Sequence, residues 1–358
     1  MLKLLVDSAF LWDMMPLNHR LTITRSIIRL MATTATTPDI NDYWRIYHSP
    51  EMLERADALR ETHSITSTGV RIHIDVYPQA SADAPVFIFN HGGGGYSRLF
   101  IPLALALHES GYTVVLPDQH GQGLSGGDRG DFTLGQCIQN VVDVSHWARE
   151  RYTGKLILSG GSFGSGITFN AGAAGAPADA LICHNLYDLG DPRSALILSR
   201  FAFLTHIPGM ARLSAMNIRL LARLLPSLRI PFLWLGIFEH MVADRHDGQF
   251  YRRWKADPYP IRVVSLRYLA SVANTPPAYP LEANRLPVLV INPILDKMTT
   301  PEETRRNYER LGGEKQYVEI PYGHWALGDD FVQTWVSAVD DFVTRCTDCC
   351  NPPPDSAY

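Results

Sequence analysis

Residues 155–169 read KLILSGGSFGSGITF, and this stretch decides the fold. Lys155 to Leu158 is a short apolar run of the kind found in buried strands. The glycines that follow allow the chain to turn sharply into a helix that begins near Ser162. The stretch therefore predicts a strand, a tight turn and a helix, with Ser162 at the turn.

Gly160 and Gly164 lie two residues before and two residues after Ser162. They leave room for the backbone to fold around a serine in strained geometry, with its hydroxyl exposed and the N–H groups of a helix beside it. This arrangement is the nucleophile elbow. A GxSxG pattern alone is a weak signal, so the prediction depends on partners from the rest of the chain.

The composition is that of an ordinary globular protein. The chain has 358 residues, 46% hydrophobic and 19% charged, which fits one α/β domain with an insertion or two modest domains. Its net charge of −4 argues against nucleic acid as a main partner. The five cysteines, three of them in the tail CTDCC, make a poor disulfide framework and favour a reducing compartment. No second Cys/His cluster completes a metal site with that tail, which we interpret as frayed.

The sequence contains no apolar run of the roughly 18 to 20 residues that span a membrane. The N-terminal stretch MLKLLVDSAFLWDMM is interrupted by Asp7 and Asp13, and no small-residue cleavage site follows it. We therefore expect a cytoplasmic protein. Residues 1–30 are either a docked amphipathic helix or an upstream extension that the fold does not need.

Strands and helices alternate along most of the chain. Besides Lys155–Leu158, strands are expected at Val86–Asn90, Tyr112–Leu116, Ala178–His184, Leu286–Ile291 and Gln316–Ile320. Helices are expected at Arg98–Glu109, Phe132–Arg151, Glu302–Leu311 and Asp330–Val343. Val70–Tyr77 alternates as VRIHIDVY, which predicts a half-exposed strand at the edge of the sheet. The fold class is therefore α/β, with a mostly parallel, doubly wound sheet whose working loops follow the carboxyl ends of the strands.

The alternation stops between Leu186 and Ala283, where no convincing strand is found. We interpret this segment as a mainly helical cap inserted into the core. The predicted division is an N-terminal extension (1–45), the first part of the core (46–185), the cap (186–285), the second part of the core (286–345) and a C-terminal tail (346–358).

A serine hydroxyl becomes nucleophilic when a base takes its proton and a third group orients that base. Asp296 follows the strand at Leu286–Ile291 by a short loop, and His324 follows the strand at Gln316–Ile320. The chain order Ser, Asp, His, each after a strand, predicts a catalytic triad of Ser162, Asp296 and His324. Asp329 and Asp330 could compete for the acidic role, but they come after the histidine and resemble helix caps.

Two N–H groups are needed to hold the oxyanion of a tetrahedral intermediate. We expect one from Phe163, which follows the nucleophile, and one from Gly93 in the run HGGGG after the strand at Val86–Asn90, with Gly94 as the alternative. His91 is expected to order this loop through hydrogen bonds of its ring. A phosphate cradle is the competing interpretation of HGGGG, but the Lys and Ser/Thr of a P-loop are missing.

The segments HGGGGYS, PDQHGQGLSGG and GGSFG, together with Asp296 and Gly323-His324, resemble the α/β-hydrolase superfamily from about Val70 to Val343. DQHGQGLS is similar to the DxxGHGxS segment of the monoacylglycerol lipase and lysophospholipase-like (serine aminopeptidase S33-type) branch, with Gln122 in place of the usual histidine. KADPYP resembles an Asp-Pro motif in the cap of that branch. The resemblance implies a serine carboxylic-ester hydrolase that needs no metal, and we expect no cofactor.

The segment from Arg193 to Phe238 contains arginine but no acidic residue and is otherwise largely apolar. Arg212, Arg219 and Arg223 share one helical face, while leucines fill the others. Either this helix simply packs on the core with its arginines at the rim, or its apolar face lines an acyl pocket and its basic face meets anionic lipid.

The expected function is hydrolysis of carboxylic esters with medium or long acyl chains, as in lipases and esterases. The same triad could cleave an acyl lactone or an amide, or transfer the acyl group to an alcohol. A protein of this fold that binds a ligand without turning it over is the alternative from another class. The expected partners are a small acyl substrate and a membrane surface contacted through the cap.

Overall fold

The computed structural model describes residues 42–325 and 328–348. Their central element is an eight-stranded sheet. The expectations for residues 1–30, and for the tail beyond residue 348, lie outside the described residues. The strands are β1 (Glu61–Ser67), β2 (Val70–Tyr77), β3 (Val86–Asn90), β4 (Thr113–Pro117), β5 (Leu156–Gly161), β6 (Ala180–His184), β9 (Val288–Pro293) and β10 (Lys315–Ile320).

The order across the sheet is β1-β2-β4-β3-β5-β6-β9-β10. β2 pairs antiparallel with β1 and β4, whereas all the other pairs are parallel. The predicted mostly parallel, doubly wound sheet is therefore confirmed. The loops after β3, β5, β6, β9 and β10 leave the sheet at the same edge.

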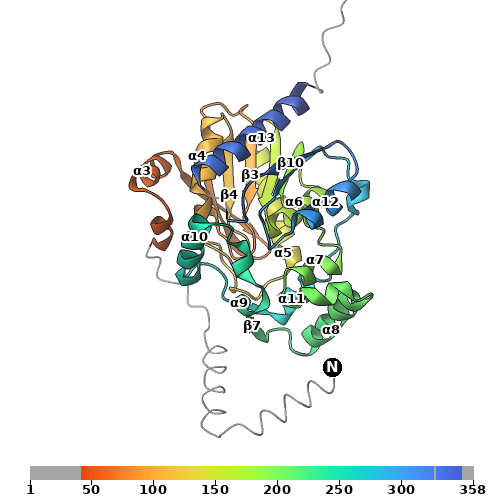
Figure 1. Cartoon of the computed structure of the whole chain (residues 1–358). Helices are drawn as coiled ribbons and strands as arrows, with labels where there is room; N and C mark the ends of the chain where they lie inside the picture. Colours follow the sequence, from red (N-terminus) through yellow and green to blue (C-terminus); the bar gives the residue numbers. More distant parts are fainter. Residues whose placement is uncertain (1–41, 326–327, 349–358) are drawn as a thin grey trace, which may run out of the picture. The chain divides into compact units, whose positions relative to one another are not determined.

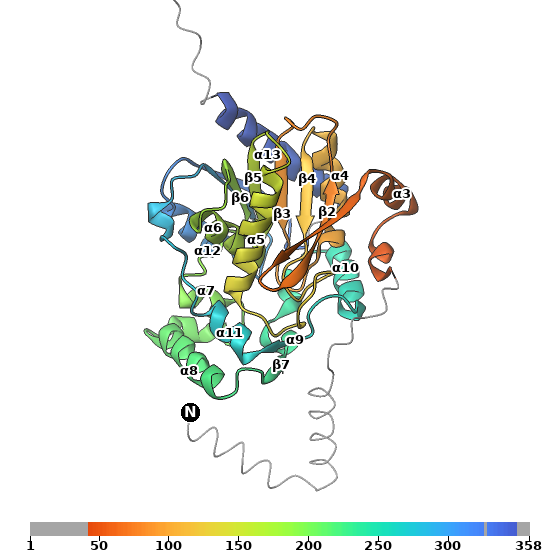
Figure 2. The same ribbon diagram turned by 180° about the vertical axis from the view of Figure 1, so that it is seen from behind.

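Helices cover both faces of this sheet. In Figure 1, α4 (Ile101–Glu109) and α13 (Asp329–Asp348) lie in front of the strands, and Figure 2 shows α5 (Leu134–Arg149) and α6 (Phe163–Ala173) on the opposite face. The remaining elements of the core are η1 (Tyr43–Tyr47), α3 (Pro50–Leu59), η2 (Ser97–Phe100) and α12 (Pro301–Arg310).

The strand β3 illustrates why its sequence is continuously apolar. Phe87 and Phe89 belong to the hydrophobic cluster that contains α4 and α13, whereas Val86 and Ile88 belong to the cluster that contains α5. Successive side chains of a strand point to opposite faces, so a strand covered on both sides needs apolar residues at every position.

Residues between β6 and β9 form a mainly helical insertion at one end of the sheet (Figures 1 and 2). Its elements are α7 (Pro192–Ile197), η3 (Ala202–His206), α8 (Met210–Leu224), β7 (Arg229–Pro231), α9 (Phe232–Leu235), η4 (Phe238–Met241), α10 (Arg245–Ala256), β8 (Val263–Ser265), α11 (Leu266–Val272) and η5 (Leu281–Ala283). No helix in the described part of the chain is long and apolar enough to cross a membrane.

Three details of the sequence prediction were wrong. β2 is not an edge strand, because β1, a polar strand with the sequence ETHSITS, pairs along its outer side. The insertion does contain strands, because β7 and β8 pair antiparallel, but strands of three residues are too short to show a period-2 pattern. The last helix continues past Val343 to Asp348, into the segment assigned to the tail.

A buried carboxylate joins β2 to its neighbours. Asp75 is fully buried, and its oxygens lie 3.0 Å from Thr62 Oγ1, 3.0 Å from His73 Nε2 and 2.9 Å from Arg98 Nε. Burial by itself raises the pKa of Asp75, but the hydrogen bonds and charges of His73 and Arg98 outweigh burial and lower it below the ordinary 3.8. The folded state therefore favours the ionised form of this group.

Replacing Asp75 by asparagine is expected to lower the free energy of unfolding by about 3 kcal/mol at pH 7, because the largely covered Arg98 loses its counter-charge. The pKa of Asp75 is lower in the folded state than in the unfolded state, where it is 3.8. Its ionised carboxylate therefore stabilises the fold above pH 3.8, and this stabilisation is lost as the pH falls towards the pKa of the folded state. Urea unfolding should therefore show that the difference in the free energy of unfolding between the wild-type protein and Asp75→Asn becomes smaller below about pH 4. The surface variant Asp179→Asn should cost less than about 1 kcal/mol, and an equal loss in both variants would contradict the prediction.

Candidate active site

Ser162 occupies the turn between β5 and α6 with φ 54° and ψ −129°. Positive φ is uncommon for a residue other than glycine and costs of order 1–3 kcal/mol. The turn brings the start of α6 against the end of β3, since a Cβ at Gly164 would lie 2.4 Å from Asn90 O. The backbone thus has the strained strand-turn-helix geometry that the sequence predicted.

Asp296 and His324 lie in the loops after β9 and β10, and the fold brings them into contact. His324 Nδ1 lies 2.7 Å from Asp296 Oδ2, and because a carboxylate only accepts, Nδ1 is the donor. The other oxygen, Oδ1, accepts from the backbone N–H groups of Met298 at 2.8 Å and Thr299 at 3.2 Å. Both carboxylate oxygens of Asp296 are therefore held in place, and Nε2 of His324 is the ring nitrogen left for chemistry.

The two competing carboxylates lie elsewhere. Asp329 and Asp330 are exposed in the first turn of α13, and neither lines a cavity beside Ser162.

The sequence reasoning missed the loop after β6, residues 185–188 (NLYD). Asn185, with φ 60°, donates from Nδ2 to Asp296 Oδ2 at 3.2 Å. The Tyr187 hydroxyl is hydrogen-bonded to Thr299 Oγ1. Burial raises the pKa of Tyr187, and hydrogen bonds from Thr299 and Ser162 act in the opposite direction. The rule that found Asp296, a polar residue just after a buried parallel strand, applies equally to this loop.

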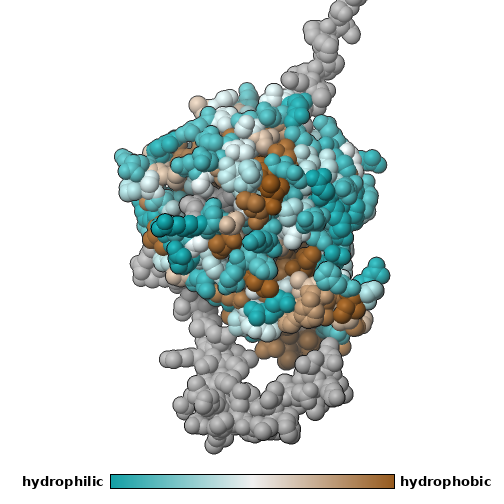
Figure 3. All heavy atoms as spheres, viewed as in Figure 1, coloured by the Kyte–Doolittle hydropathy of each residue, from teal (hydrophilic) through white to brown (hydrophobic). Residues whose placement is uncertain are grey.

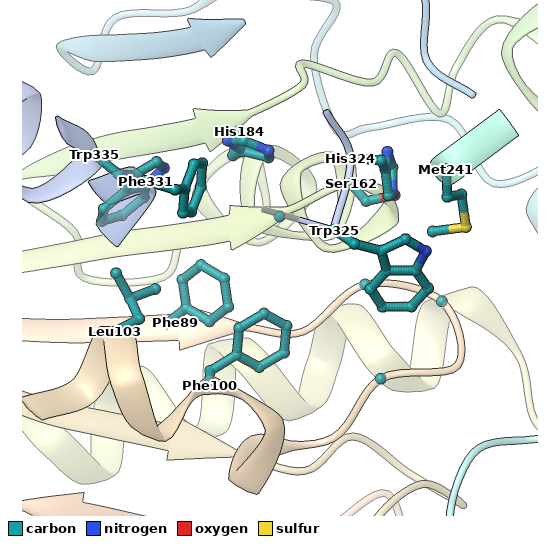
Figure 4. A pocket seen from close by; sticks show the side chains of 14 residues that line it. Phe89, Phe100, Leu103, Ser162, His184, Met241, His324, Trp325, Phe331 and Trp335 are labelled. Atoms are coloured by element: carbon teal, nitrogen blue, oxygen red, sulfur yellow. The ribbon is translucent and has the colours of Figure 1, made fainter. Parts of the chain in front are cut away.

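Two cavities meet at Ser162, Gly93 and His324, which line both of them. The aromatic cavity, of about 70 Å³, lies between the sheet, α4 and α13 (Figure 4). Its largest side chains are Phe89, Phe100, Leu103, Trp325, Phe331 and Trp335. The insertion cavity, of about 160 Å³, is lined from α7, α9, η4 and α11, chiefly by Leu198, Phe232, Leu235, Phe238, Tyr268 and Leu269. Both cavities are mostly apolar.

The glycine loop after β3 presents Gly93 to both cavities. The N–H groups of Gly93 and Phe163 donate to no other group within the described residues. Gly94 has a different role, since its carbonyl accepts from Trp254 Nε1 at 2.8 Å and its φ is 73°. A Cβ at Gly94 would lie 3.0 Å from the Trp254 ring, so this position fastens the loop to α10.

His91 orders the glycine loop from within. Its Nδ1 donates to Gly92 O at 3.0 Å, and its Nε2 accepts from the backbone N–H of Gln119 at 3.2 Å. Burial lowers the pKa of His91, which keeps the ring neutral. With both nitrogens engaged, this histidine has none left for proton transfer.

The Asp-Pro motif of KADPYP links the insertion to the core. Asp257 accepts hydrogen bonds from the hydroxyls of Tyr96 at 2.7 Å and Tyr47 at 2.8 Å. Burial raises the pKa of Asp257, and these hydrogen bonds counteract the rise. Tyr96 follows the glycine loop directly, so Asp257 helps to hold that loop.

Of the two interpretations of the arginine-bearing helix, the one in which its leucines line an acyl pocket was wrong. That helix is α8, and none of its residues lines either cavity. Leu220 and Leu224 are 56% and 71% exposed. The arginines and most of the leucines of α8 both face outward, and the cavity is lined by shorter elements of the insertion instead.

In the part of the chain that the structure describes, no three His, Cys, Asp or Glu side chains lie close enough together to hold a metal ion.

Several solved structures share the fold. An α/β-hydrolase, GrgF, from Penicillium sp. sh18 is 18% identical, with 80% of this chain and 98% of that chain covered and a TM-score of 0.61. A soluble variant of monoglyceride lipase from Saccharomyces cerevisiae is 16% identical, with 80% and 95% covered and a TM-score of 0.62. A monoacylglycerol lipase from Paleococcus ferrophilus is 19% identical, with 78% and 98% covered and a TM-score of 0.56.

No curated protein sequence matches the chain. The family model Hydrolase_4, described as serine aminopeptidase, S33, matches residues 81–325, which is more than half of the chain. The match covers the glycine loop, the elbow, the insertion and His324. The chain therefore belongs to the serine aminopeptidase S33 family of α/β-hydrolases.

Proposed function

We propose that this hydrolase cleaves carboxylic esters of medium or long acyl chains through an acyl-enzyme on Ser162. The observation that carries the proposal is the position of Ser162 and His324 where two apolar cavities meet, with His324 oriented by Asp296. An ester has two arms, and each cavity can take one of them.

In the proposed mechanism, Ser162 Oγ attacks the ester carbonyl while Nε2 of His324 takes its proton. Asp296 keeps the imidazole in the tautomer with a proton on Nδ1 and stabilises the imidazolium that forms. The free N–H groups of Gly93 and Phe163 hold the oxyanion. His324 then passes the proton to the leaving oxygen, and a water molecule activated by the same imidazole releases the acid.

The apolar lining supports a hydrocarbon substrate. Transfer of a chain from water to such a cavity contributes about 0.8 kcal/mol for each buried CH₂ group, so longer chains should gain kcat/KM until the cavity is full. Each two-carbon extension therefore corresponds to a gain of roughly tenfold.

The experiment is a series of p-nitrophenyl esters from acetate to palmitate, combined with labelling by a fluorophosphonate probe. We expect labelling of Ser162 and a maximum of kcat/KM at medium or long chains. Labelling without hydrolysis of any ester would favour lactone or amide cleavage or acyl transfer. Absence of both labelling and hydrolysis would favour a ligand-binding protein.

We further propose that the outer face of α8 contacts anionic lipid. Besides its exposed leucines, α8 carries Arg212, Arg219 and Arg223, which are exposed and form no ion pair with a described residue. Figure 3 shows apolar side chains gathered on the surface around α8. Exposed apolar residues beside arginines match the chemistry of a lipid surface.

Replacing Arg212, Arg219 and Arg223 by glutamine is expected to weaken binding to phosphatidylserine vesicles by about hundredfold, since each arginine contributes about 1 kcal/mol near such a surface. Co-sedimentation with vesicles measures the effect, and hydrolysis of a soluble short ester should be retained. The control removes the same charge from exposed arginines elsewhere, Arg55, Arg151 and Arg305. Equal vesicle binding by both triple variants would remove the membrane contact from the proposal.

A further inference from the structure

The aromatic cavity contains a polar side chain that the proposed mechanism does not use. His184, the last residue of β6, lines this cavity and is only 7% exposed. Its Nδ1 is buried without a hydrogen-bond partner, and neither ring nitrogen bonds any described residue. Its ring meets Phe331 edge to face, with centroids 5.7 Å apart and planes at 89°.

A buried imidazole with an unpartnered nitrogen lowers the stability of the fold. A buried polar atom that lacks a partner costs about 1–3 kcal/mol, and an apolar side chain of similar size would avoid this cost. The contrast with His91 is direct, because both nitrogens of that buried ring are hydrogen-bonded. Nδ1 itself is fully enclosed, so Nε2, which is not among the enclosed unpartnered atoms, is the nitrogen that can gain a partner from a ligand in the cavity.

The ring of His184 is neutral at ordinary pH. Burial, followed by the nearby His324, lowers its pKa to about 3. A neutral imidazole has one N–H donor and one acceptor nitrogen. It therefore complements a group that can accept and donate.

His184 lies directly beside the nucleophile. In the parallel pairing of β5 and β6 it stands opposite Gly161, and its carbonyl accepts from the Ser162 N–H at 2.9 Å. Figure 4 shows the His184 ring between Ser162 and the aromatic pair Phe331 and Trp335. A chain that runs from Ser162 towards this pair therefore passes the imidazole.

The direction of the reaction indicates which arm of the ester takes this path. The leaving oxygen must face His324 to receive its proton. In Figure 4, Met241 and Trp325 lie on the far side of Ser162 from the pair Phe331 and Trp335. An acyl chain bonded on the opposite side of the carbonyl carbon from the leaving group would then extend past His184.

We propose that the aromatic cavity takes an acyl chain with a hydroxyl group near its carbonyl, and that His184 binds this hydroxyl. The substrate class is esters of medium-chain hydroxy fatty acids, which rests on the esterase function proposed above. A hydroxyl both donates and accepts, so it pairs with the neutral ring in either tautomer. The remaining carbons contact the aromatic side chains.

The test compares p-nitrophenyl octanoate with the esters of (R)- and (S)-3-hydroxyoctanoate. We expect the wild-type protein to prefer one hydroxy enantiomer over octanoate by about tenfold in kcat/KM, because a desolvated hydrogen bond in a fixed position favours one configuration. In His184→Phe the ratio should fall to about one, and His184→Gln, which keeps a donor and an acceptor, should retain part of it. The control Phe331→Leu alters the same cavity without removing the nitrogens and should keep the ratio.

Two results would overturn the proposal. One is equal or faster turnover of octanoate relative to both hydroxy esters by the wild-type protein. The other is an unchanged ratio in both His184 variants. The urea midpoint of His184→Phe adds a readout of folding, and we expect no loss, because the substitution removes an unpartnered polar atom. Failure of the esterase function itself is distinguishable, since it would abolish hydrolysis of all three esters, whether or not the fluorophosphonate still labels Ser162.

Discussion

Replacing Ser162 by alanine is expected to lower kcat/KM for p-nitrophenyl esters by about 10⁴-fold or more and to abolish labelling by a fluorophosphonate. The reason is that Ser162 supplies the hydroxyl that attacks the ester carbonyl in the proposed mechanism. Ser162 has φ 54° and alanine has the same Cβ, so we expect the backbone and the fold to be retained in this variant. Steady-state kinetics and intact-protein mass spectrometry after labelling measure the two effects.

Ser159→Ala is the matched control for this variant. Ser159 lies in β5, is fully buried, lines neither cavity and has an Oγ without a hydrogen-bond partner. Its loss should leave both hydrolysis and labelling at wild-type levels. Persistent labelling of Ser162→Ala at another residue would show that the nucleophile is not Ser162.

The second large effect is expected for Asp296→Asn, which should lower kcat by about 10⁴-fold at neutral pH. Asp296 accepts from four N–H groups, those of His324, Asn185, Met298 and Thr299. An asparagine has only one oxygen, so its amide group must face either His324 or the two backbone donors. If it faces His324, the imidazole is turned to the tautomer with a proton on Nε2, which cannot accept a proton from serine.

The measurement is single-turnover kinetics with p-nitrophenyl octanoate, together with the urea midpoint of the variant. Asp330→Asn is the control, because Asp330 is the exposed carboxylate that follows the histidine in sequence. A variant Asp296→Asn with near wild-type kcat, or an equal loss in Asp330→Asn, would contradict the assignment of the acid.

His184, at the end of β6, and the loop 185–188 that follows it explain why these side chains stay in place. They supply Asn185 to Asp296, Tyr187 to Thr299 and Ser162, and His184 to the aromatic cavity. Asp188 at the end of the loop is paired with Arg310 of α12 at 2.7 Å. One short segment thus connects the acid, the nucleophile and a cavity wall.

Local sequence patterns were sufficient for the strands at the centre of the sheet and for the side chains that follow them. A strand covered on both faces is apolar throughout, so β3, β5, β6 and β9 could be recognised without a structure. In a parallel sheet the loops after such strands share one edge, which is why the sequence could place Ser162, Asp296 and His324 at the same edge in advance.

The same patterns failed where the outcome depended on distant partners. β1 alternates between exposed and partly covered residues, and its polar composition gave no sign that it would pair with β2. The leucines of α8 suggested a helix packed by its apolar face, yet only Ala215 of that helix is buried. Periodicity identifies a helix with an apolar side, but it does not tell what that side contacts.

The amino-acid sequence by itself determined the α/β class, the elbow at Ser162 and the loops that carry Asp296 and His324, because these depend on local apolar runs, glycines and the order of elements. Only the tertiary structure decided the order of the outer strands, the four donors around Asp296, the outward face of α8 and the unpartnered His184 in the aromatic cavity. The cavity joins Phe89 of β3, Leu103 of α4 and Phe331 of α13, residues far apart in the chain. These residues come together because of how the helices pack on the sheet, and this packing cannot be predicted from local sequence patterns.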